Sequence, residues 1–393
     1  MHLAPGEQRR TLEALAPCHY IYPPALCAEE INWTMGRSRV AQPLHLFSPR
    51  TVRHPGTDRM RPRDALLKLL YERGAEKLAS LKCNMNLRFK RDPFQETAVH
   101  MLVKGSKVNL RKGLKSRRWF RTEFGSRTMW YMLRGGEEVS DATHESEGEL
   151  TREHLLPLLD ELPYVAVYLG FLGIHTPKEL RKLKLQLWET LNAVRYFLWD
   201  SHVVFVDAPK DFQWKPNDYV KVMRLEDLCV FDEVVLLDPN AEESLTSHDV
   251  LNADVFLFGG IVDKEIPRPG LTSKIPCDCC RRRRIELWGS TVGVPLMIHK
   301  LVFAVLMARY ELRGDIQKAI IKVMGSRERR WRLAWEAITA YKEGKDPLEA
   351  VLRKAEALGA SRAEVVRALK MSGIEGGKLA ERLQAEHSGE DRH

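Results

Sequence analysis

Short apolar runs alternate with longer crossover segments in the middle of the chain, between residues 161 and 325. Such short apolar runs are the pattern of strands buried on both faces of a parallel sheet. The run-bearing segments are 164–173, 202–209, 233–239, 254–263 and 284–288. Helical periods in 176–199, 294–310 and 315–324 supply the covering helices. We therefore expect an α/β domain over 161–325.

The flanking stretches have different periods. Residues 65–81 have a helical period and 87–113 alternate like short strands with turns, which predicts a small mixed α+β N-terminal domain over 64–160. After residue 325, three segments each begin at Ser or Asp and stop at Gly, as helices do. They span 326–344, 346–359 and 361–373, and they predict a helical C-terminal domain over 326–393.

Residues 1–63 are rich in proline and arginine and show no period. We expect a basic, poorly ordered arm. The alternative is that translation starts at an internal methionine such as Met60 and that the arm is not native. The N-terminus lacks the basic start and apolar stretch of a signal peptide, and no window is apolar enough to span a membrane, so a cytoplasmic location is expected.

Cysteine usage argues against a secreted disulfide framework. The chain has seven cysteines, an odd number spread over 393 residues, so reduced thiols are expected. Cys277, Cys279 and Cys280 invite a metal interpretation. However, no second pair of cysteines lies nearby in the sequence, and a structural zinc needs four ligands. No metal site is therefore expected.

Positive charge is concentrated in one segment. The net charge is +9, and residues 104–134 alone hold ten Lys or Arg against one acid, interleaved with aromatic residues. This combination favours an RNA-contacting surface, with phosphates on the cations and bases on aromatic planes. The expected contacts are Lys112, Lys115, Arg117, Arg118, Arg121 and Arg127. The alternative is a solvated basic β-surface, and several of the aromatics are expected in the core in either case.

A second arginine run, 281–284, offers Arg281 and Arg282 as further RNA contacts, with an ordinary charged loop as the alternative.

The most specific local motif precedes this arginine run in the sequence. Gly259 and Gly260 end a predicted strand, where the backbone can approach a ligand closely, and Asp263 follows at the strand's carboxyl end. A simple turn with a capping Asp is the alternative. Neither NTPase nor zinc-protease nor esterase motifs occur in the sequence.

The ordered set FGGIVDK, the LLDP one strand earlier, the IELWGSTVGVPLMIHKLVFAVL that follows and the upstream HTPKELRKLKLQLWETLNAVR resemble the SPOUT family of tRNA methyltransferases that modify N1 of the purine at position 9. The resemblance covers residues 160–325, and the flanking domains suit its archaeal branch. It implies a knotted parallel-sheet core and S-adenosylmethionine as cofactor. It further implies that tRNA is the partner and that the protein is monomeric.

By resemblance, three loops hold the adenosine half of the cofactor. The implied cofactor residues are Leu236, Leu237, Asp238, Gly259, Gly260, Ile261, Ile285, Leu287, Ser290, Val294, Leu296 and His299. His299 is expected to be a packed residue beside the cofactor rather than a base. Some relatives carry acids at the end of the first core strand, where this chain has Tyr168 to Leu172, so a second carboxylate is not carried over.

Asp263, Gln186 and Asn192 are the implied catalytic residues, and Arg195 on the same helix as the two amides is an expected RNA contact. N1 of guanine carries a proton, which a carboxylate can accept, whereas N1 of adenine has a free lone pair and needs only orientation or charge stabilisation. For both amides a structural role is equally open. The sequence leaves two other functions open, a SPOUT methyltransferase for another RNA nucleotide and a non-catalytic RNA-binding protein of the same fold.

Overall fold

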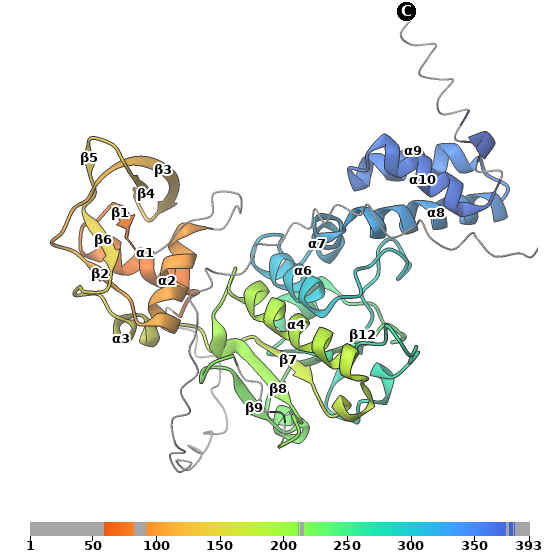
Figure 1. Cartoon of the computed structure of the whole chain (residues 1–393), viewed down its shortest axis with the longest axis horizontal. Coiled ribbons are helices and arrows are strands. Elements are labelled where there is room, and N and C mark those ends of the chain that lie inside the picture. The colour runs from red at the N-terminus through yellow and green to blue at the C-terminus, as the bar shows by residue number, and fades with distance from the viewer. Residues whose placement is uncertain are drawn as a thin grey trace, which may run out of the picture. The chain divides into compact units, whose positions relative to one another are not determined.

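The computed structural model describes residues 59–81, 92–210, 212, 216–374, 377–379 and 381. The predicted arm lies outside the described residues except for its last five positions. Of these, Met60 pairs with Leu159 in a parallel bridge, and its N–H donates to the Leu158 carbonyl at 2.8 Å. The described chain contains two six-stranded sheets (Figure 1).

The first sheet has the strand order β2-β6-β1-β4-β3-β5, and β1 runs parallel to both of its neighbours. A core of buried apolar residues from α1, α2 and the sheet holds this part together. Its elements are α1 (Pro62–Glu72), β1 (Lys77–Ser80), α2 (Pro93–Lys104), β2 (Lys107–Asn109), β3 (Lys115–Phe124), β4 (Arg127–Arg134), β5 (Glu138–Val139), β6 (Ala142–Glu145) and α3 (Arg152–Leu155).

Two predictions for this part are wrong in detail. The helix predicted over 65–81 ends at Glu72, because the chain turns at Gly74, whose φ of +72° suits glycine, and continues as β1. Of the region predicted as short strands, residues 93–104 form α2 instead. Asp92 caps its first turn, Pro93 occupies the first helical position, and Gly105 ends it in a left-handed conformation. These start and stop signals outweigh the local alternation.

The second sheet is entirely parallel, with the order β12-β10-β11-β7-β8-β9, so the predicted mixed α/β core with a parallel sheet is confirmed. Its elements are β7 (Tyr164–Tyr168), α4 (Pro177–Val194), β8 (Val203–Val206), β9 (Lys221–Met223), β10 (Val234–Leu237), α5 (Ser247–Asn252), β11 (Val255–Gly259), β12 (Arg281–Arg283), α6 (Ile298–Tyr310) and α7 (Ile316–Val323). The predicted strand at 284–288 is wrong, because β12 ends at Arg283. The apolar Ile285 and Leu287 instead pack into the core from a turn.

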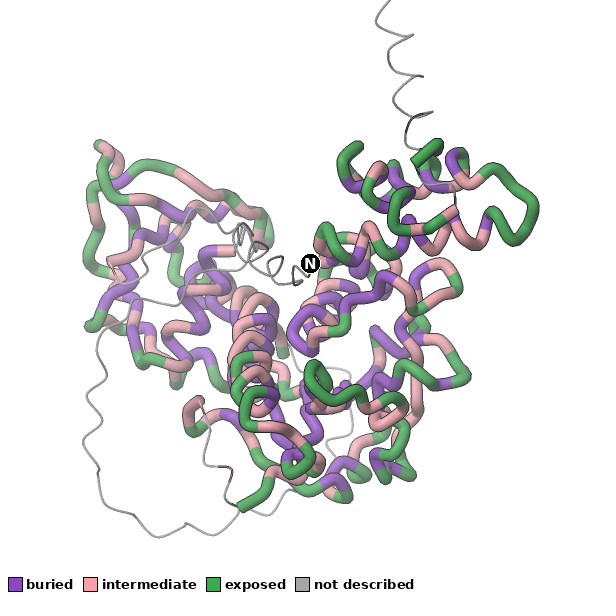
Figure 2. Tube along the Cα trace, turned by 45° about the vertical axis from the view of Figure 1, so that its right-hand side comes forward, coloured by how far each residue is buried: buried purple, intermediate pink, exposed green. Residues whose placement is uncertain are grey.

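Alternate residues of the four central strands, β7, β8, β10 and β11, face two different cores. Val165, Val167 and Phe205 pack against α4, α6 and α7 on one face. Ala166 and Val204 belong to a smaller cluster on the other face, which is covered by the 3₁₀ helix η4 (Leu225–Val230) and the loop before β12. Buried and exposed stretches alternate along the tube in Figure 2. These four strands are therefore buried on both faces, as is typical of a parallel sheet.

Three helices follow the core, α8 (Ser326–Lys342), α9 (Pro347–Leu358) and α10 (Arg362–Ser372). Asp346 and Ser361 cap α9 and α10 at their N-termini, and Gly359 and Gly373 end them in left-handed conformations. Their buried residues belong to the same cluster as the α4 and α6 face of the sheet. No described helix is long and apolar enough to cross a membrane.

Candidate functional site

The strand order creates a switch point between β7 and β11. From β7 the chain passes to β8 and β9 on one side and then returns through β10 to β11 on the other side. Open α/β sheets bind ligands at the carboxyl ends of strands where the order reverses. The carboxyl ends here are Tyr168 and Gly259, in register with each other. The predicted glycine motif therefore lies at the position where a ligand site is expected.

The two glycines of the motif have different surroundings. A Cβ on Gly260 would lie 2.4 Å from the Tyr168 carbonyl oxygen, and the Gly260 N–H donates to that oxygen at 2.9 Å. Gly260 is thus required by packing between adjacent chain segments. A Cβ on Gly259 would meet only side-chain atoms, the nearest being Thr272 Oγ1 at 3.1 Å and Ile261 Cδ1 at 3.2 Å. Gly259 is the glycine whose absent side chain can serve a ligand.

Glu179 fixes the loop that follows β11. Its fully buried carboxylate accepts hydrogen bonds from the backbone N–H groups of Glu265 (2.9 Å) and Ile266 (3.2 Å). It also caps α4 through the Thr176 N–H. The Arg268 guanidinium pairs with it at 3.0 Å and, with the backbone donors, lowers the pKa of Glu179 to about 2. The loop carrying Asp263 is therefore tied to the start of α4.

Two further contacts hold the same loop. Val262 N–H donates to Nε2 of His175 at 3.0 Å, and the other ring nitrogen of His175 lies 3.2 Å from the Leu172 carbonyl, so that nitrogen carries the proton. Arg268 also donates to the Ile174 carbonyl at 2.6 Å. Asp263 itself is exposed, and the structure gives its carboxylate no hydrogen bond or ion pair with another described residue. The loop is held at both sides while Asp263 points a carboxylate to solvent.

The two predicted amides differ in role. Gln186 Oε1 accepts from Ile298 N–H at 3.0 Å and so caps the start of α6. Asn192 is half-buried further along α4. Because six residues separate them, they project from different sides of the helix. The structure therefore supports a structural role for Gln186, and the catalytic roles of both amides stay predictions.

Most predicted apolar cofactor residues gather in one place. Leu237, Ile285, Leu287 and Val294 belong to the core cluster that covers the α4 and α6 face, together with Val262 from the candidate loop. Leu236 is fully buried in the cluster on the opposite face. Since neighbouring strand residues point to opposite faces, the side chains of Leu236 and Leu237 cannot wall the same pocket. Leu296 is 71% exposed.

Most polar residues predicted to bind the cofactor form hydrogen bonds within the protein itself. Asp238 is buried, and its Oδ1 accepts from Asn240 N–H and Ser273 Oγ, both at 3.0 Å. Ser290 closes a tight turn with Leu287 through two backbone hydrogen bonds. Burial, followed by the charge of Lys300, lowers the pKa of His299 to about 4, so its imidazole is neutral at neutral pH. Asp238 therefore shapes its loop rather than offering a carboxylate to a ligand.

The predicted RNA-contacting cations between residues 104 and 134 fall into two groups. Lys115, Arg117 and Arg121 are exposed. Arg118 instead forms a bidentate pair with Glu138 (2.8 and 2.9 Å) and stacks over Trp130, with 4.8 Å from its Cζ to the ring centroid. Lys112 and Arg127 are also paired, with Glu145 and Glu76. Other aromatics of this segment are core, as expected, with Tyr131 fully buried and Trp119, Phe120 and Phe124 packed against that core.

The second arginine run is an edge strand rather than a charged loop. Arg281 pairs with Glu233, and Arg283 donates to Asp249 Oδ2 at 3.0 Å. Arg282 donates to the Ile275 carbonyl at 2.7 Å. These arginines are half-buried and hold β12 to the segments beside it. Arg281 and Arg282 therefore have a role in the fold, and the expectation that they contact RNA stays a prediction.

Arg195 is also committed to the fold. Its guanidinium forms two hydrogen bonds of 2.6 Å to the carboxylate of Asp200, which is fully buried. Asn217 donates to the same carboxylate. Breaking such a buried pair would leave an uncompensated charge, so Arg195 has a structural role, and its expected contact with RNA stays a prediction.

The sequence interpretation missed a group of lysines beside the candidate loop. Lys264 follows Asp263 directly, and it lies close enough to Lys182 on α4 to lower the pKa of that lysine. Lys178, one turn earlier, pairs with Glu265 at 2.8 Å. Spacing along α4 could have placed Lys178 and Lys182 on one face. Their proximity to Lys264 depends on the fold.

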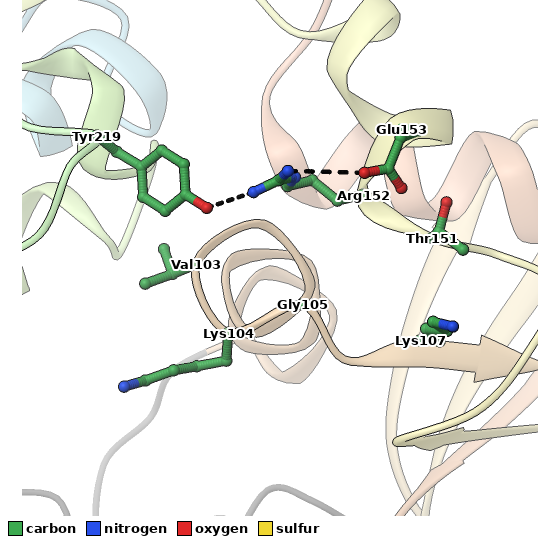
Figure 3. Close-up of a pocket in the computed structure, with 8 residues that line it drawn as sticks. All are labelled: Val103, Lys104, Gly105, Lys107, Thr151, Arg152, Glu153 and Tyr219. Carbon is green, nitrogen blue, oxygen red and sulfur yellow. Dashed lines mark hydrogen bonds and ion pairs between the residues drawn. The ribbon is translucent and has the colours of Figure 1, made fainter. Parts of the chain in front are cut away.

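A separate shallow pocket lies away from these loops (Figure 3). Its volume is about 320 Å³, and none of the predicted cofactor residues lines it. Arg152 contacts the Tyr219 hydroxyl there, and Lys104 and Lys107 add positive charge. The pocket is basic and open, and it lacks the glycine loop expected of a cofactor site.

Comparison with known proteins identifies similar archaeal enzymes. The chain is 29% identical over 201 residues to the tRNA (adenine(9)-N1)-methyltransferase of Sulfolobus acidocaldarius, and 31% identical over 205 residues to the tRNA (guanine(9)-/adenine(9)-N1)-methyltransferase of Thermococcus kodakarensis. The chain is a relative of archaeal tRNA purine-9 N1-methyltransferases. The matches cover 50% and 48% of this chain, and 66% and 55% of the relatives' own lengths.

Two further comparisons concern the fold of this relative of the purine-9 methyltransferases. The protein arginine N-methyltransferase SFM1-like family matches residues 202–306, which run from the start of β8 into α6. The crystal structure of Sulfolobus acidocaldarius Trm10 in complex with S-adenosylhomocysteine superposes with a TM-score of 0.61, at 22% identity, over 79% of this chain and 99% of that chain. The shared fold therefore extends beyond the sequence match.

Proposed function

We propose that this protein transfers a methyl group from S-adenosylmethionine to N1 of adenine or guanine at position 9 of tRNA. The observation that carries the proposal is the loop from Gly259 to Asp263, which lies at the switch point and is fixed by Glu179, Arg268 and His175. The two archaeal relatives bear names with this activity. The six-stranded parallel order supports a SPOUT-type core, and we include its knot in the proposal.

Gly259 and the apolar side chains of the neighbouring loops fit the cofactor. Backbone at Gly259 can approach a flat adenine ring because only flexible side-chain atoms lie where a Cβ would be. Leu237, Ile285, Leu287 and Val294 supply one continuous apolar cluster next to that backbone. S-adenosylmethionine, when bound, supplies its methyl group as an electrophile. The protein's part is to hold the purine N1 in line with that methyl group and to exclude water.

Asp263 is the side chain that we assign to the purine. Its carboxylate is exposed at the end of a loop whose backbone is held by buried contacts, so its position is defined while it stays accessible. With guanine it accepts the N1 proton, and with adenine it stabilises the positive charge left on the ring. The carboxylate of Asp238 accepts hydrogen bonds from its own loop, whereas that of Asp263 is exposed, so we assign the proton acceptor to Asp263.

Two basic surfaces suit the tRNA. Lys115, Arg117 and Arg121 on β3 form the basic surface of the N-terminal part, and we propose that this part, over 64–160, contacts phosphates. Lys264 follows Asp263 directly and lies close to Lys182, and these two lysines would meet phosphates near the reacting base. The C-terminal helices, over 326–393, would complete the tRNA contact around a methyltransferase domain at 161–325. A monomeric state and a cytoplasmic location belong to the same proposal.

Protein arginine methylation is the second candidate function, since the SFM1-like family matches the core. A guanidinium substrate would favour acidic surroundings. Lys182 and Lys264 instead place cations beside Asp263, which favours a polyanion. A different RNA nucleotide, or RNA binding without catalysis, would leave the same basic surfaces and would differ in the product.

The test of the proposed function uses unmodified tRNA transcripts that carry adenine or guanine at position 9. After incubation with the protein and S-adenosylmethionine, mass spectrometry of nucleosides should show 1-methyladenosine, 1-methylguanosine or both, and transcripts with a pyrimidine at position 9 should stay unmodified. Methylation elsewhere in the tRNA, or none, would reject the assignment. Methylation of arginine peptides instead would favour the second candidate.

Asp263→Asn separates the two roles of the carboxylate. The amide keeps the shape and hydrogen bonding but removes the charge and basicity, so the single-turnover rate on guanine-9 tRNA should fall about 10²- to 10⁴-fold. The rate on an adenine-9 substrate should fall less and should depend less on pH. Equal losses on both purines with parallel pH profiles would show that Asp263 is not the proton acceptor.

A further inference from the structure

Four cysteine sulfurs converge on the face of the core sheet opposite α4 and α6. Cys229 belongs to η4, and Cys277, Cys279 and Cys280 belong to the loop before β12. Cys229 and Cys279 form one disulfide, with Cα atoms 5.6 Å apart, and Cys277 and Cys280 form another, with Cα atoms 5.4 Å apart. Sulfurs of the three loop cysteines all lie within 4.8 Å of one another. The two disulfides are therefore one cluster.

We propose that these four cysteines, when reduced, bind a single Zn²⁺ ion as a tetrathiolate site. Tetrahedral zinc has Zn–S bonds of about 2.3 Å, which places its sulfur ligands about 3.8 Å apart. The sulfurs of Cys277 and Cys279, which belong to different disulfides, lie 3.8 Å apart. Four ligands from two segments, with no residue of another type among them, match the closed ligand set of structural zinc. The expectation of no metal site overlooked Cys229, which is 50 residues from its partner.

The surroundings of the cluster suit a structural ion that solvent can reach. Cys277 is 5% exposed and packs with Ile275 and Leu228 in the core of this face. Cys229 and Cys279 are exposed, so a reductant and a metal ion both have access. The ion would join η4 to the long loop between β11 and β12. All four coordination positions would be filled by protein, so the ion would stabilise the fold and take no part in the methyl transfer.

The oxidised and metal-bound forms are related by a balanced exchange. A dithiol reductant attacks each disulfide, gives up two electrons and two protons, and is itself oxidised to a disulfide, leaving four thiols in the protein. Binding of Zn²⁺ to the four thiolates then releases four protons to solvent. Removal of the ion in the presence of an oxidising disulfide restores the two protein disulfides.

The sequence provides a matched set of variants. Cys229→Ser removes a ligand from the proposed site. The triple variant Cys18→Ser, Cys27→Ser and Cys83→Ser removes the three remaining cysteines, which lie outside the described residues, and keeps the cluster intact. Only the first variant should lose the metal.

The experiment uses the full chain, reduced with dithiothreitol and desalted without oxygen, and then loaded with Zn²⁺ or Co²⁺. Zinc analysis after gel filtration should give one ion per chain in the wild type and in the triple variant, and none in Cys229→Ser. The Co²⁺ form should show the intense visible absorption of tetrahedral cobalt with a thiolate charge-transfer band, and Zn²⁺ should abolish both. This outcome does not depend on tRNA or on methyl transfer.

A measurement on the wild type keeps the test independent of how the variants fold. Zinc should slow alkylation of Cys229, Cys277, Cys279 and Cys280, measured peptide by peptide with mass spectrometry, and should leave alkylation of Cys83 unchanged. The proposal is overturned if protein with all seven thiols free binds no zinc. It is equally overturned if zinc is lost in the triple variant and retained in Cys229→Ser.

Discussion

Two arginine-rich strands in this protein, β3 and β12, place their cations in different surroundings. On β3, Lys115, Arg117 and Arg121 project exposed cations from the N-terminal sheet. On β12, the side chain of Arg283 is 15% exposed and that of its partner Asp249 is 2% exposed. These β3 cations are thus exposed to solvent, whereas the run on β12 pairs with acids of its own chain, among them the buried Asp249 and Asp238.

The difference comes from what surrounds each strand. β12 is an edge strand against β10, with α5 and the loop after β10 supplying Asp249, Glu243 and Asp238. Burial alone would raise the pKa of Asp249, but hydrogen bonds from Thr246 and Arg283 outweigh it and lower that pKa. Beside β3, Glu138 on β5 pairs with Arg118 and also with Lys77. Counting cations therefore predicts the charge of a segment but not its availability.

The largest effect should follow from breaking the β12 pairs. Asp249→Ala removes a buried carboxylate that accepts from Thr246 and Arg283, so the free energy of unfolding should fall by about 3 kcal/mol. Glu226→Ala breaks a pair with Arg224 whose side chains are 67% and 72% exposed, and should cost less than about 1 kcal/mol. Urea unfolding followed by circular dichroism measures both. Equal losses would show that the Asp249–Arg283 pair stabilises the fold no more than an ordinary surface ion pair does.

The next effect concerns binding. Alanine at Lys115, Arg117 and Arg121 together should weaken tRNA binding, and the slope of log K against log[salt] should decrease by about 0.7 to 0.9 for each lost phosphate contact. Arg118→Ala is the matched control, since its guanidinium already pairs with Glu138, and it should change the slope less. Filter binding at several salt concentrations measures the slope. An unchanged slope in the triple variant would remove β3 from the tRNA surface.

The sequence predicted the main strands and helices of the core, but it could not predict this contrast between β3 and β12. The apolar runs predicted β7, β8, β10 and β11, and the helical period predicted α4, because burial on both faces leaves a continuous pattern. Arg195 pairs with Asp200 and Arg283 pairs with Asp249. Both pairs depend on tertiary contacts. The hydrogen bonds between Glu179 and the loop after β11 also depend on tertiary contacts, so the sequence could not predict them. Its capping of α4 follows from Thr176 three residues earlier, but its hold on residues 265 and 266 does not.

The smallest expected effect is a change of stability with pH. It concerns Arg268, a cation paired with the buried Glu179. The pKa of Glu179 lies at about 2 in the folded protein against an ordinary 4.5, so its stabilising effect is complete above pH 4.5 and is lost as the pH falls towards 2. Glu179→Gln cannot titrate there. Urea unfolding of the variant and of the wild type should differ at pH 6, and the difference should shrink at pH 3. A difference that grows at pH 3 would contradict the assigned pair.

The central claim is that the carboxyl ends of β7 and β11 hold S-adenosylmethionine, and titration calorimetry of Gly259→Ala tests it most directly. The new Cβ would meet only the flexible Thr272 and Ile261 side chains, so the protein should stay folded while the cofactor loses its close approach. Affinity for S-adenosylmethionine should fall at least about tenfold, equivalent to about 1.4 kcal/mol. Gly377→Ala, where nothing lies within 4 Å of an added Cβ, should bind as the wild type does. Wild-type affinity in a folded Gly259→Ala protein would contradict the account.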